Sequence, residues 1–284
     1  VVETVKPGRK TTEILADLVP DSVQHFSWPK SMRWGAGATR WVRPLQGIVC
    51  LFDGKPVRLA VDGVAAGRTT RGHRFMGSAS EFDVEDFEDY RRKLLAEHVM
   101  LEPADRADAI RRGAKALAAE HDLELVEDES LVVENAGLVE WPVVLMGSFD
   151  EAFLAVPAEV LSTAMKAQQK CFSLRHPRGK KLAARFLLVA NLKAKDGGKQ
   201  IVAGNEKVIR ARLSDAKFFW EQDKKKKLEP MHFELKTVTF HDKLGSQWER
   251  MERVTELARA IAGAVDAEPE LAGRAAQLCK ADLV

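Results

Sequence analysis

The sequence contains few of the residues that stabilise secreted proteins or build metal sites. Its 284 residues include three cysteines, Cys50, Cys171 and Cys279, which are far apart and form no Cys-x-x-Cys pair. An odd number of isolated cysteines is typical of a reduced compartment, where thiols stay free. A structural zinc ion needs about four ligands, whereas the seven histidines are scattered. We therefore expect a cytoplasmic protein without metal ligands.

Long apolar segments are also missing. The candidates, residues 141–146 and 186–189, are far shorter than the roughly 20 apolar residues that a membrane helix needs. The N-terminus lacks the charged start and apolar core of a signal peptide, so we expect no membrane partner. With 45% hydrophobic and 30% charged residues, the chain is long enough for about two soluble domains. It begins with Val1 rather than Met and stops inside an expected helix, so we expect it to be a fragment.

Complete catalytic and nucleotide-binding motifs are absent from the sequence as well. Gly35-x-Gly37 is followed by Arg40 where a dinucleotide fingerprint needs its third glycine, and residues 197–199 lack the other parts of a phosphate loop. His241-Asp242 supplies two metal ligands at most. No nucleophile lies in a glycine-flanked elbow. We therefore assign no catalytic residue.

What the sequence does contain is a basic stretch with interspersed aromatic residues. Between positions 30 and 74, nine Lys or Arg face two acids, an excess of seven, whereas the whole chain carries a net charge of +2. Guanidinium groups match phosphate in geometry and charge, and aromatic rings can stack on bases. The alternative is a solvated rim around a packed core. We predict RNA contacts from Lys30, Arg33, Trp34, Arg40, Arg43, Arg71, His73 and Arg74.

Hydrophobic periodicity predicts a mixed α/β fold followed by a helical segment. The dipeptides Asp53-Gly54 and Asp62-Gly63 predict two hairpin turns. We expect helices near residues 87–98, 104–120, 131–140 and 157–168, and strands near 141–147, 170–174 and 184–191. A later helix is expected to bury Met251, Val254, Ala258, Ile261 and Val265. The polar, glycine-containing residues 193–200 form the expected linker between a mixed domain, 1–196, and a helical segment, 197–284.

The first helix after this linker has an apolar stripe and a polar one. Over residues 204–221, apolar side chains follow helical spacing at Ile209, Leu213, Ala216 and Trp220, and Arg210, Ser214 and Lys217 repeat that spacing. We predict that Arg210 and Lys217 contact RNA, with a solvated face as the alternative. Phe218 lies opposite the apolar stripe, and an exposed Phe forgoes roughly 1.5–3 kcal/mol of burial. We therefore expect Phe218 to be covered by the mixed domain before the linker, by the part of the protein missing from this fragment, or by a partner subunit.

Longer sequence blocks identify a family. They comprise residues 30–35 (KSMRWG), Thr39-Arg40 with Arg43-Pro44, and residues 70–75 (TRGHRF), 138–144, 156–161, 165–170 and 204–219. In these blocks, which keep the family's order across nearly the whole chain, the sequence resembles the beta subunit of the bacterial two-subunit glycyl-tRNA synthetase. The sequence contains neither the His-x-Gly-His and Lys-Met-Ser-Lys-Ser signatures of one class of aminoacyl-tRNA synthetases nor a convincing arginine-centred ATP motif of the other class.

The resemblance implies a component of an enzyme that joins glycine to its tRNA using ATP, built from two alpha and two beta subunits. The alpha subunit would hold the adenylate-forming site with its ATP and magnesium, so we expect no cofactor in this chain. The beta subunit would bind and position tRNA(Gly), with the alpha subunit and a second beta subunit as partners. Residues 1–196 would resemble the editing-like domain of the phenylalanyl enzyme. Residues 197–284 would enter a phosphohydrolase-type (HD-like) helical domain.

Two alternatives stay open at the level of sequence. One is a stand-alone RNA-binding factor, and the other is a hydrolase that edits mischarged tRNA with the same fold. The resemblance also implies that the family's anticodon-binding region is not part of this chain, so we expect no anticodon reading by it.

Overall fold

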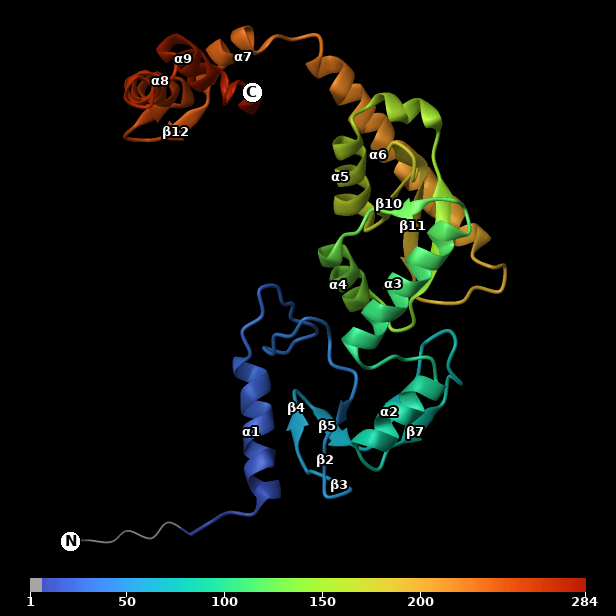
Figure 1. Ribbon diagram of the computed structural model, residues 1–284. Coiled ribbons are helices and arrows are strands. Elements are labelled where there is room, and N and C mark those ends of the chain that lie inside the picture. The colour runs from blue at the N-terminus through green and yellow to red at the C-terminus, as the bar shows by residue number, and fades with distance from the viewer. Residues whose placement is uncertain (1–6) are drawn as a thin grey trace, which may run out of the picture. The chain divides into compact units, whose positions relative to one another are not determined.

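The computed structural model describes residues 7–284, and its elements are labelled in Figure 1. The contacts divide the chain into two compact units, one of Val1–Phe149 with Met165–Val208 and the other of Asp150–Ala164 with Ile209–Val284. The chain thus passes between the units after Phe149, within the helix α5 (Ala158–Gln169) and within the helix α6 (Lys199–Asp223). The boundary predicted at residues 196 and 197 stays a prediction. The fold is mixed α/β, with several small sheets.

The N-terminal part of the first unit consists of two helices and short strands. They are α1 (Thr11–His25), β1 (Ile48–Val49), β2 (Leu51–Phe52), β3 (Lys55–Pro56), β4 (Ala60–Val61), β5 (Val64–Gly67), β6 (Thr69–Arg71), β7 (Glu81–Asp83) and α2 (Phe87–Ala96). The antiparallel pairs β2–β3 and β4–β5 confirm both predicted hairpins. Their turns, Asp53-Gly54 and Asp62-Gly63, have positive φ at both positions, as two-residue hairpin loops require.

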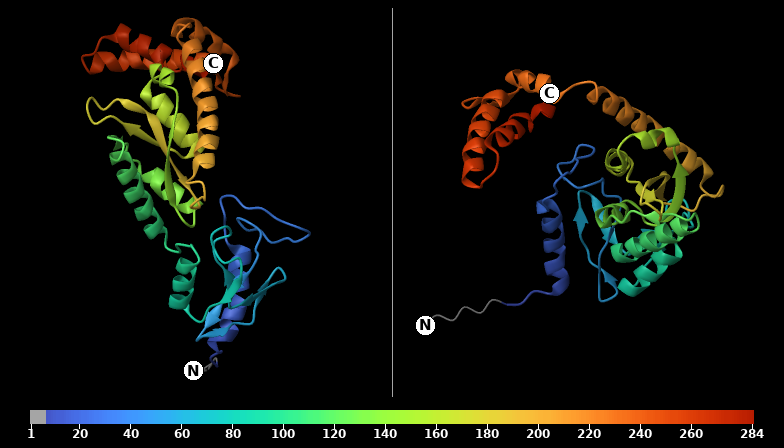
Figure 2. Two further views of the ribbon diagram at one scale, coloured as in Figure 1. Left: turned by 90° about the vertical axis from the view of Figure 1, so that its right-hand side faces the viewer. Right: turned by 45° about the horizontal axis from the view of Figure 1, so that its top comes forward.

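A four-stranded antiparallel sheet forms the core of this unit, in the order β8-β10-β11-β9. Its strands are β8 (Glu124–Leu125), β9 (Val143–Ser148), β10 (Phe172–Arg175) and β11 (Leu182–Ala190), and β10 and β11 are seen in two further views in Figure 2. The strands β9 and β11 pair from Val143 opposite Ala190 to Ser148 opposite Arg185. The predicted strands at 141–147, 170–174 and 184–191 are therefore confirmed within two residues.

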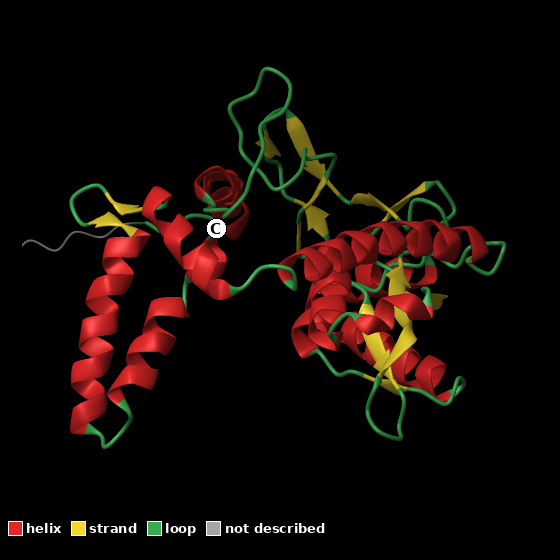
Figure 3. Ribbon diagram, turned by 90° about the horizontal axis from the view of Figure 1, so that it is seen from above, coloured by secondary structure: helices red, strands yellow, loops and turns green. Residues whose placement is uncertain are grey.

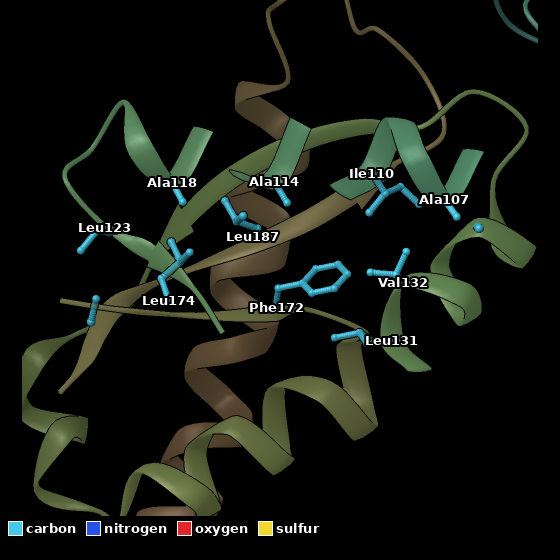
Figure 4. Packing of buried hydrophobic residues seen from close by; sticks show 12 residues of the cluster. Ala107, Ile110, Ala114, Ala118, Leu123, Leu131, Val132, Phe172, Leu174 and Leu187 are labelled. Carbon is cyan, nitrogen blue, oxygen red and sulfur yellow. The ribbon is translucent and has the colours of Figure 1, made fainter. Parts of the chain in front are cut away.

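Helices α3 (Pro103–Ala119) and α4 (Glu129–Leu138) pack on each other, and α3 lies over one face of this sheet. Figure 4 shows Ala114 and Ala118 of α3 on the side of Leu174 and Leu187, and Ala107 and Ile110 on the side of Phe172 and Val132. Alternate residues of β11, Phe186 and Leu188, are buried on its other face. Because both faces are covered, the strands read as nearly continuous apolar runs rather than as alternating ones.

The second unit ends in a helical hairpin, seen from above in Figure 3. Its C-terminal elements are α7 (Leu228–Glu234), β12 (Thr239–His241), β13 (Gly245–Ser246), α8 (Gln247–Ala264) and α9 (Pro269–Leu278), with α8 packed along α9. Ser246 caps α8: its hydroxyl accepts from the Glu249 amide, and the Glu249 carboxylate accepts from the Ser246 amide, in a capping box.

One expectation for α8 is wrong. Met251 is buried as predicted, but Ile261 and Val265 are 59% and 65% exposed. The buried positions are instead Met251, Thr255 and Ala262. They form a stripe along α8, which packs against α9. The apolar surface of α8 is wider than the strip that one neighbouring helix covers, so the sequence pattern alone did not fix which edge is buried.

Candidate nucleic-acid interface

A β-bridge brings two of the predicted basic segments together. The Met32 amide donates to the Trp41 carbonyl at 2.9 Å and the Trp41 amide to the Met32 carbonyl at 3.2 Å. Arg40 Nε donates to Ser31 Oγ across the same loop at 3.0 Å. Four cations of these segments are exposed, namely Lys30, Arg33, Arg40 and Arg43. These hydrogen bonds thus hold both basic segments within a single loop.

The tryptophans of this loop have different environments. Trp41 packs edge-on against Trp28, with ring centroids 4.8 Å apart, and is 5.8 Å from the Phe26 ring. It is therefore a structural anchor for the loop. Trp34 is half-buried, so part of its ring is free to stack on a base. Its predicted RNA contact stays a prediction.

The segment 72–78 is a tight loop fixed by backbone and side-chain hydrogen bonds. The His73 amide donates to the Glu97 carbonyl at 2.9 Å, the Gly77 amide donates to the His73 carbonyl at 2.8 Å, and the Ser78 amide donates to the Glu97 carboxylate at 2.6 Å. A Cβ on Gly72 would lie 2.4 Å from the Glu97 Cβ. Only glycine therefore fits this approach of the loop to the residue after α2.

The His73 ring holds this loop from inside. The residue is 1% exposed, and its Nδ1 lies 3.2 Å from both the Phe75 and Met76 amide nitrogens. Two amide donors require an unprotonated acceptor, so we assign the proton to Nε2, which donates to the Asn191 carbonyl at 2.6 Å. This placement contradicts the expectation that the ring faces RNA. Both ring nitrogens are used within the protein.

The residues next to His73 remain open. Phe75 is 71% exposed, and the Arg74 guanidinium lies over its ring at 5.7 Å. Arg71 and Arg74 also line an open cavity of about 1410 Å³ between the β6–β7 region and the start of α2. Tyr90 also lines this cavity, and burial raises its pKa. Because Phe75 is exposed beside Arg74, the loop displays a cation and an aromatic ring together.

Arg71 differs from the other predicted cations because it is paired. Its Nη2 lies 2.5 Å from Glu81 Oε1, and Nε donates to the same oxygen at 2.9 Å. By contrast, the other five cations predicted to contact RNA in this stretch, Lys30, Arg33, Arg40, Arg43 and Arg74, are exposed and have no ion pair within residues 7–284. We call these five the N-terminal basic surface. Their charge is not neutralised within the described protein.

The remaining predicted residues lie on α6. Its apolar stripe is confirmed at Ile209 and Leu213, which are 0% exposed, whereas Ala216 and Trp220 are half-buried. Arg210 is exposed, Lys217 is half-buried, and Ser214 Oγ donates to the Arg210 carbonyl at 2.8 Å. Phe218 is 56% exposed, so the described chain leaves more than half of it uncovered. This is the outcome that the sequence argument linked to a partner outside the chain.

Within residues 7–284, no cluster of three or more His, Cys, Asp or Glu side chains could hold a metal ion. Burial raises the pKa of the Cys171 thiol to about 12, which keeps it protonated and non-nucleophilic. None of the helices in the described range has the length and apolar character to cross a membrane.

Two structural features were not predicted from the sequence. Asn191 joins three segments, because its carbonyl accepts from His73 while its Oδ1 accepts from the Glu140 and Trp141 amides at 2.7 and 3.1 Å. No sequence signal marks such a junction. The second feature is the run of four consecutive lysines at residues 224–227. The run itself is visible in the sequence, but the exposure of the aromatic rings near it is seen only in the structure.

Comparison with known proteins identifies the family of this mixed α/β chain. The family described as "Glycyl-tRNA synthetase beta subunit" matches residues 1–284. Among similar proteins are the glycine–tRNA ligase beta subunits of Phenylobacterium zucineum, 50% identical over 282 residues, and of Ruegeria sp., 50% identical over 287 residues. The corresponding subunit of Cereibacter sphaeroides is 50% identical over 286 residues.

The matched proteins are subunits of aminoacyl-tRNA synthetases, and this is the class of protein to which the matches point. The chain belongs to the glycyl-tRNA synthetase beta subunit family, as its sequence blocks predicted. Each alignment covers 98% of this chain but only 41–42% of the relative. The chain thus spans less than half the length of the relatives it matches.

Proposed function

We propose that this chain binds and positions tRNA(Gly) for ATP-dependent glycylation at the active site of an alpha subunit. The N-terminal basic surface carries the proposal, because its five exposed cations have no carboxylate partner within the described residues. A surface of this kind attracts phosphates without reading sequence. Family membership supplies the identity of the RNA.

The proposal assigns different tasks to neighbouring residues. Arg33, Arg40, Arg43, Arg74 and Lys30 contact phosphates, and Trp34 stacks on a base. His73 fixes the loop that carries Arg74. Arg71 contacts a phosphate only when its ion pair with Glu81 is broken. ATP and magnesium act at the alpha subunit, and a second beta subunit completes the assembly. An editing-like fold for residues 1–196 and an HD-like fold beyond them remain predictions from the family resemblance.

The test is tRNA binding measured as a function of salt. Arg33 and Arg74 suit it, because neither side chain makes a hydrogen bond within residues 7–284 whose loss would disturb the fold. Each Arg→Ala change should weaken tRNA binding and reduce the slope of log K against log [salt] by about 0.7–0.9. Arg178→Ala, at an exposed turn of the same unit, is the matched control. Unchanged slopes in both variants would refute the phosphate contacts.

The assembly supplies a second test. Alone, the chain should catalyse no glycine-dependent pyrophosphate exchange. With the alpha subunit present, the same two variants should raise KM for tRNA and leave KM for ATP unchanged. Pyrophosphate exchange by the chain alone would instead place adenylate chemistry within it.

A further inference from the structure

The end of α6 combines strong positive charge with exposed aromatic rings. Between positions 207 and 227, eight Lys or Arg face three acids, an excess of five in a chain whose net charge is +2. Four of these cations are the consecutive lysines 224–227, in the turn that joins α6 to α7 in Figure 1. We call Lys217, Phe218, Phe219 and residues 224–227 the α6 end.

The lysines of the α6 end are not neutralised by the protein. All four residues 224–227 are exposed. The ion pairs of this unit within the described residues join Arg259 to Glu270 and Arg274 to Glu229, so none of them uses these lysines. Lys225 Nζ lies 3.4 Å from Gln222 Oε1, and Lys224 Nζ lies 5.8 Å from the Trp220 ring centroid. Their charges are therefore available to a ligand.

Two phenylalanines, Phe218 and Phe219, lie six and five residues before the first of these lysines. Phe218 and Phe219 are 56% and 61% exposed, and their rings meet edge-to-face with centroids 5.5 Å apart. The dipole of a helix favours lysines at its C-terminus, so the position of the charges alone has a structural explanation. The dipole does not explain two adjacent exposed rings, each of which would gain from being covered.

We propose that the α6 end binds unpaired RNA, with bases stacked on Phe218 and Phe219 and phosphates held by residues 224–227. Aromatic rings interleaved with cations are the combination that single-stranded RNA uses, because every base has a stacking face and every linkage a charge. An apolar protein partner would account for the rings but not for lysines beside them. This surface is additional to the N-terminal basic surface and does not depend on glycylation.

The test compares binding of an oligouridylate of about 12 nucleotides with an RNA duplex of the same length. One variant replaces all four lysines 224–227 with Gln, and another carries Phe218→Ala with Phe219→Ala. Two controls match them: Lys180→Gln with Lys181→Gln, an exposed lysine pair elsewhere, and Leu257→Ala with Ile261→Ala, an exposed apolar pair on α8. Circular dichroism confirms that each variant folds.

The lysine variant should reduce the salt slope for the oligouridylate by up to about 2.8, at about 0.7 for each phosphate that a lysine no longer neutralises. The phenylalanine variant should weaken oligouridylate binding by about fivefold or more for each base that loses its stack and should change duplex binding little. Both controls should bind like the unmodified chain. Equal losses for duplex and oligouridylate in the phenylalanine variant would refute stacking.

Two further outcomes would overturn the proposal and are separable from the proposed function. If the α6-end variants bind both RNAs normally but lose association with the alpha subunit, the surface docks a protein instead. If they bind both RNAs normally and also keep that association, the α6 end is a solvated face. Arg33→Ala and Arg74→Ala, measured alongside, report on the N-terminal basic surface, so either surface can fail while the other stands.

Discussion

Replacing His73 is the most direct test of how the loop 72–78 is held. The ring makes two separable sets of hydrogen bonds, one to the Phe75 and Met76 amides and one to the Asn191 carbonyl. His73→Asn keeps an acceptor near the position of Nδ1 and loses the bond to Asn191. His73→Gln keeps a donor near the position of Nε2 and loses the acceptor for the two amides. His73→Ala loses both sets.

The magnitudes follow from the burial of these groups. Leaving a buried donor or acceptor unpaired costs about 1–3 kcal/mol, so each conservative variant should lower the free energy of unfolding by about that amount. His73→Ala, which also removes the packed ring, should cost about 3–5 kcal/mol. Urea unfolding followed by circular dichroism measures these losses.

Hydrogen exchange separates the two conservative variants. The Phe75 and Met76 amides should exchange faster in His73→Gln and remain protected in His73→Asn. If Arg74 and Phe75 contact RNA, His73→Gln should also weaken tRNA binding more than His73→Asn does. Free energies within about 0.5 kcal/mol of the unmodified chain, with unchanged exchange in both variants, would show that the ring does not hold the loop.

Two other predictions concern titratable groups that support the fold. Asp128 caps α4, because its carboxylate accepts from the Leu131 amide, and it lies 2.5 Å from Lys166 Nζ. The hydrogen bond from Lys166 is the main reason why the pKa of Asp128 is lowered to about 2. Asp128→Asn should cost less than about 1 kcal/mol, because the pair is partly exposed, and Asp128→Ala about 1 kcal/mol more, because Asn still caps the helix. The pair's stabilisation should fade as pH falls from 3.8 toward 2, so an equal acid response in Asp128→Asn would contradict it. Burial lowers the pKa of His232 below its usual 6.5, and since the unfolded chain then binds the proton more readily, stability should fall as pH drops below 6.5. Thermal unfolding of His232→Gln should lose that dependence, while His121→Gln, at an exposed site, should keep it.

The parts of the fold that the sequence predicted depend on local interactions. Asp53-Gly54 and Asp62-Gly63 adopt positive φ because the turn itself demands it. The helix predicted at 104–120 is α3, whose alanines and Ile110 follow one face of the helix. The helix predicted from 204 begins five residues earlier, at Lys199, where Asp196 accepts from the Gly198 and Gln200 amides. That side-chain contact extends the helix into the expected linker.

The parts that the sequence did not predict depend on contacts between distant residues. His73 meets Asn191 across 118 positions, and no pattern within the motif TRGHRF distinguishes a buried imidazole from an exposed one. His98, expected on the same helix as Phe87, lies beyond the end of α2 with φ at +63°. Its ring packs edge-on against Trp141 at 5.1 Å instead. Local periodicity cannot anticipate either contact.

The structure also changes how the basic stretch should be counted. Of the nine cations between positions 30 and 74, Arg71 is paired with Glu81, and Arg68 Nη2 donates to the Gly54 carbonyl at 3.1 Å. The other seven are the five cations of the N-terminal basic surface together with Lys55 and Arg58, which are also exposed. The five cations of the N-terminal basic surface would account for a salt slope of about 3.5–4.5 in tRNA binding. A steeper slope for this chain would require phosphate contacts elsewhere. The lysines 224–227, and also Lys55 and Arg58, are exposed and have no ion pair within residues 7–284. A steeper slope that returns to this range when the lysines 224–227 are replaced with Gln would connect the two proposed surfaces.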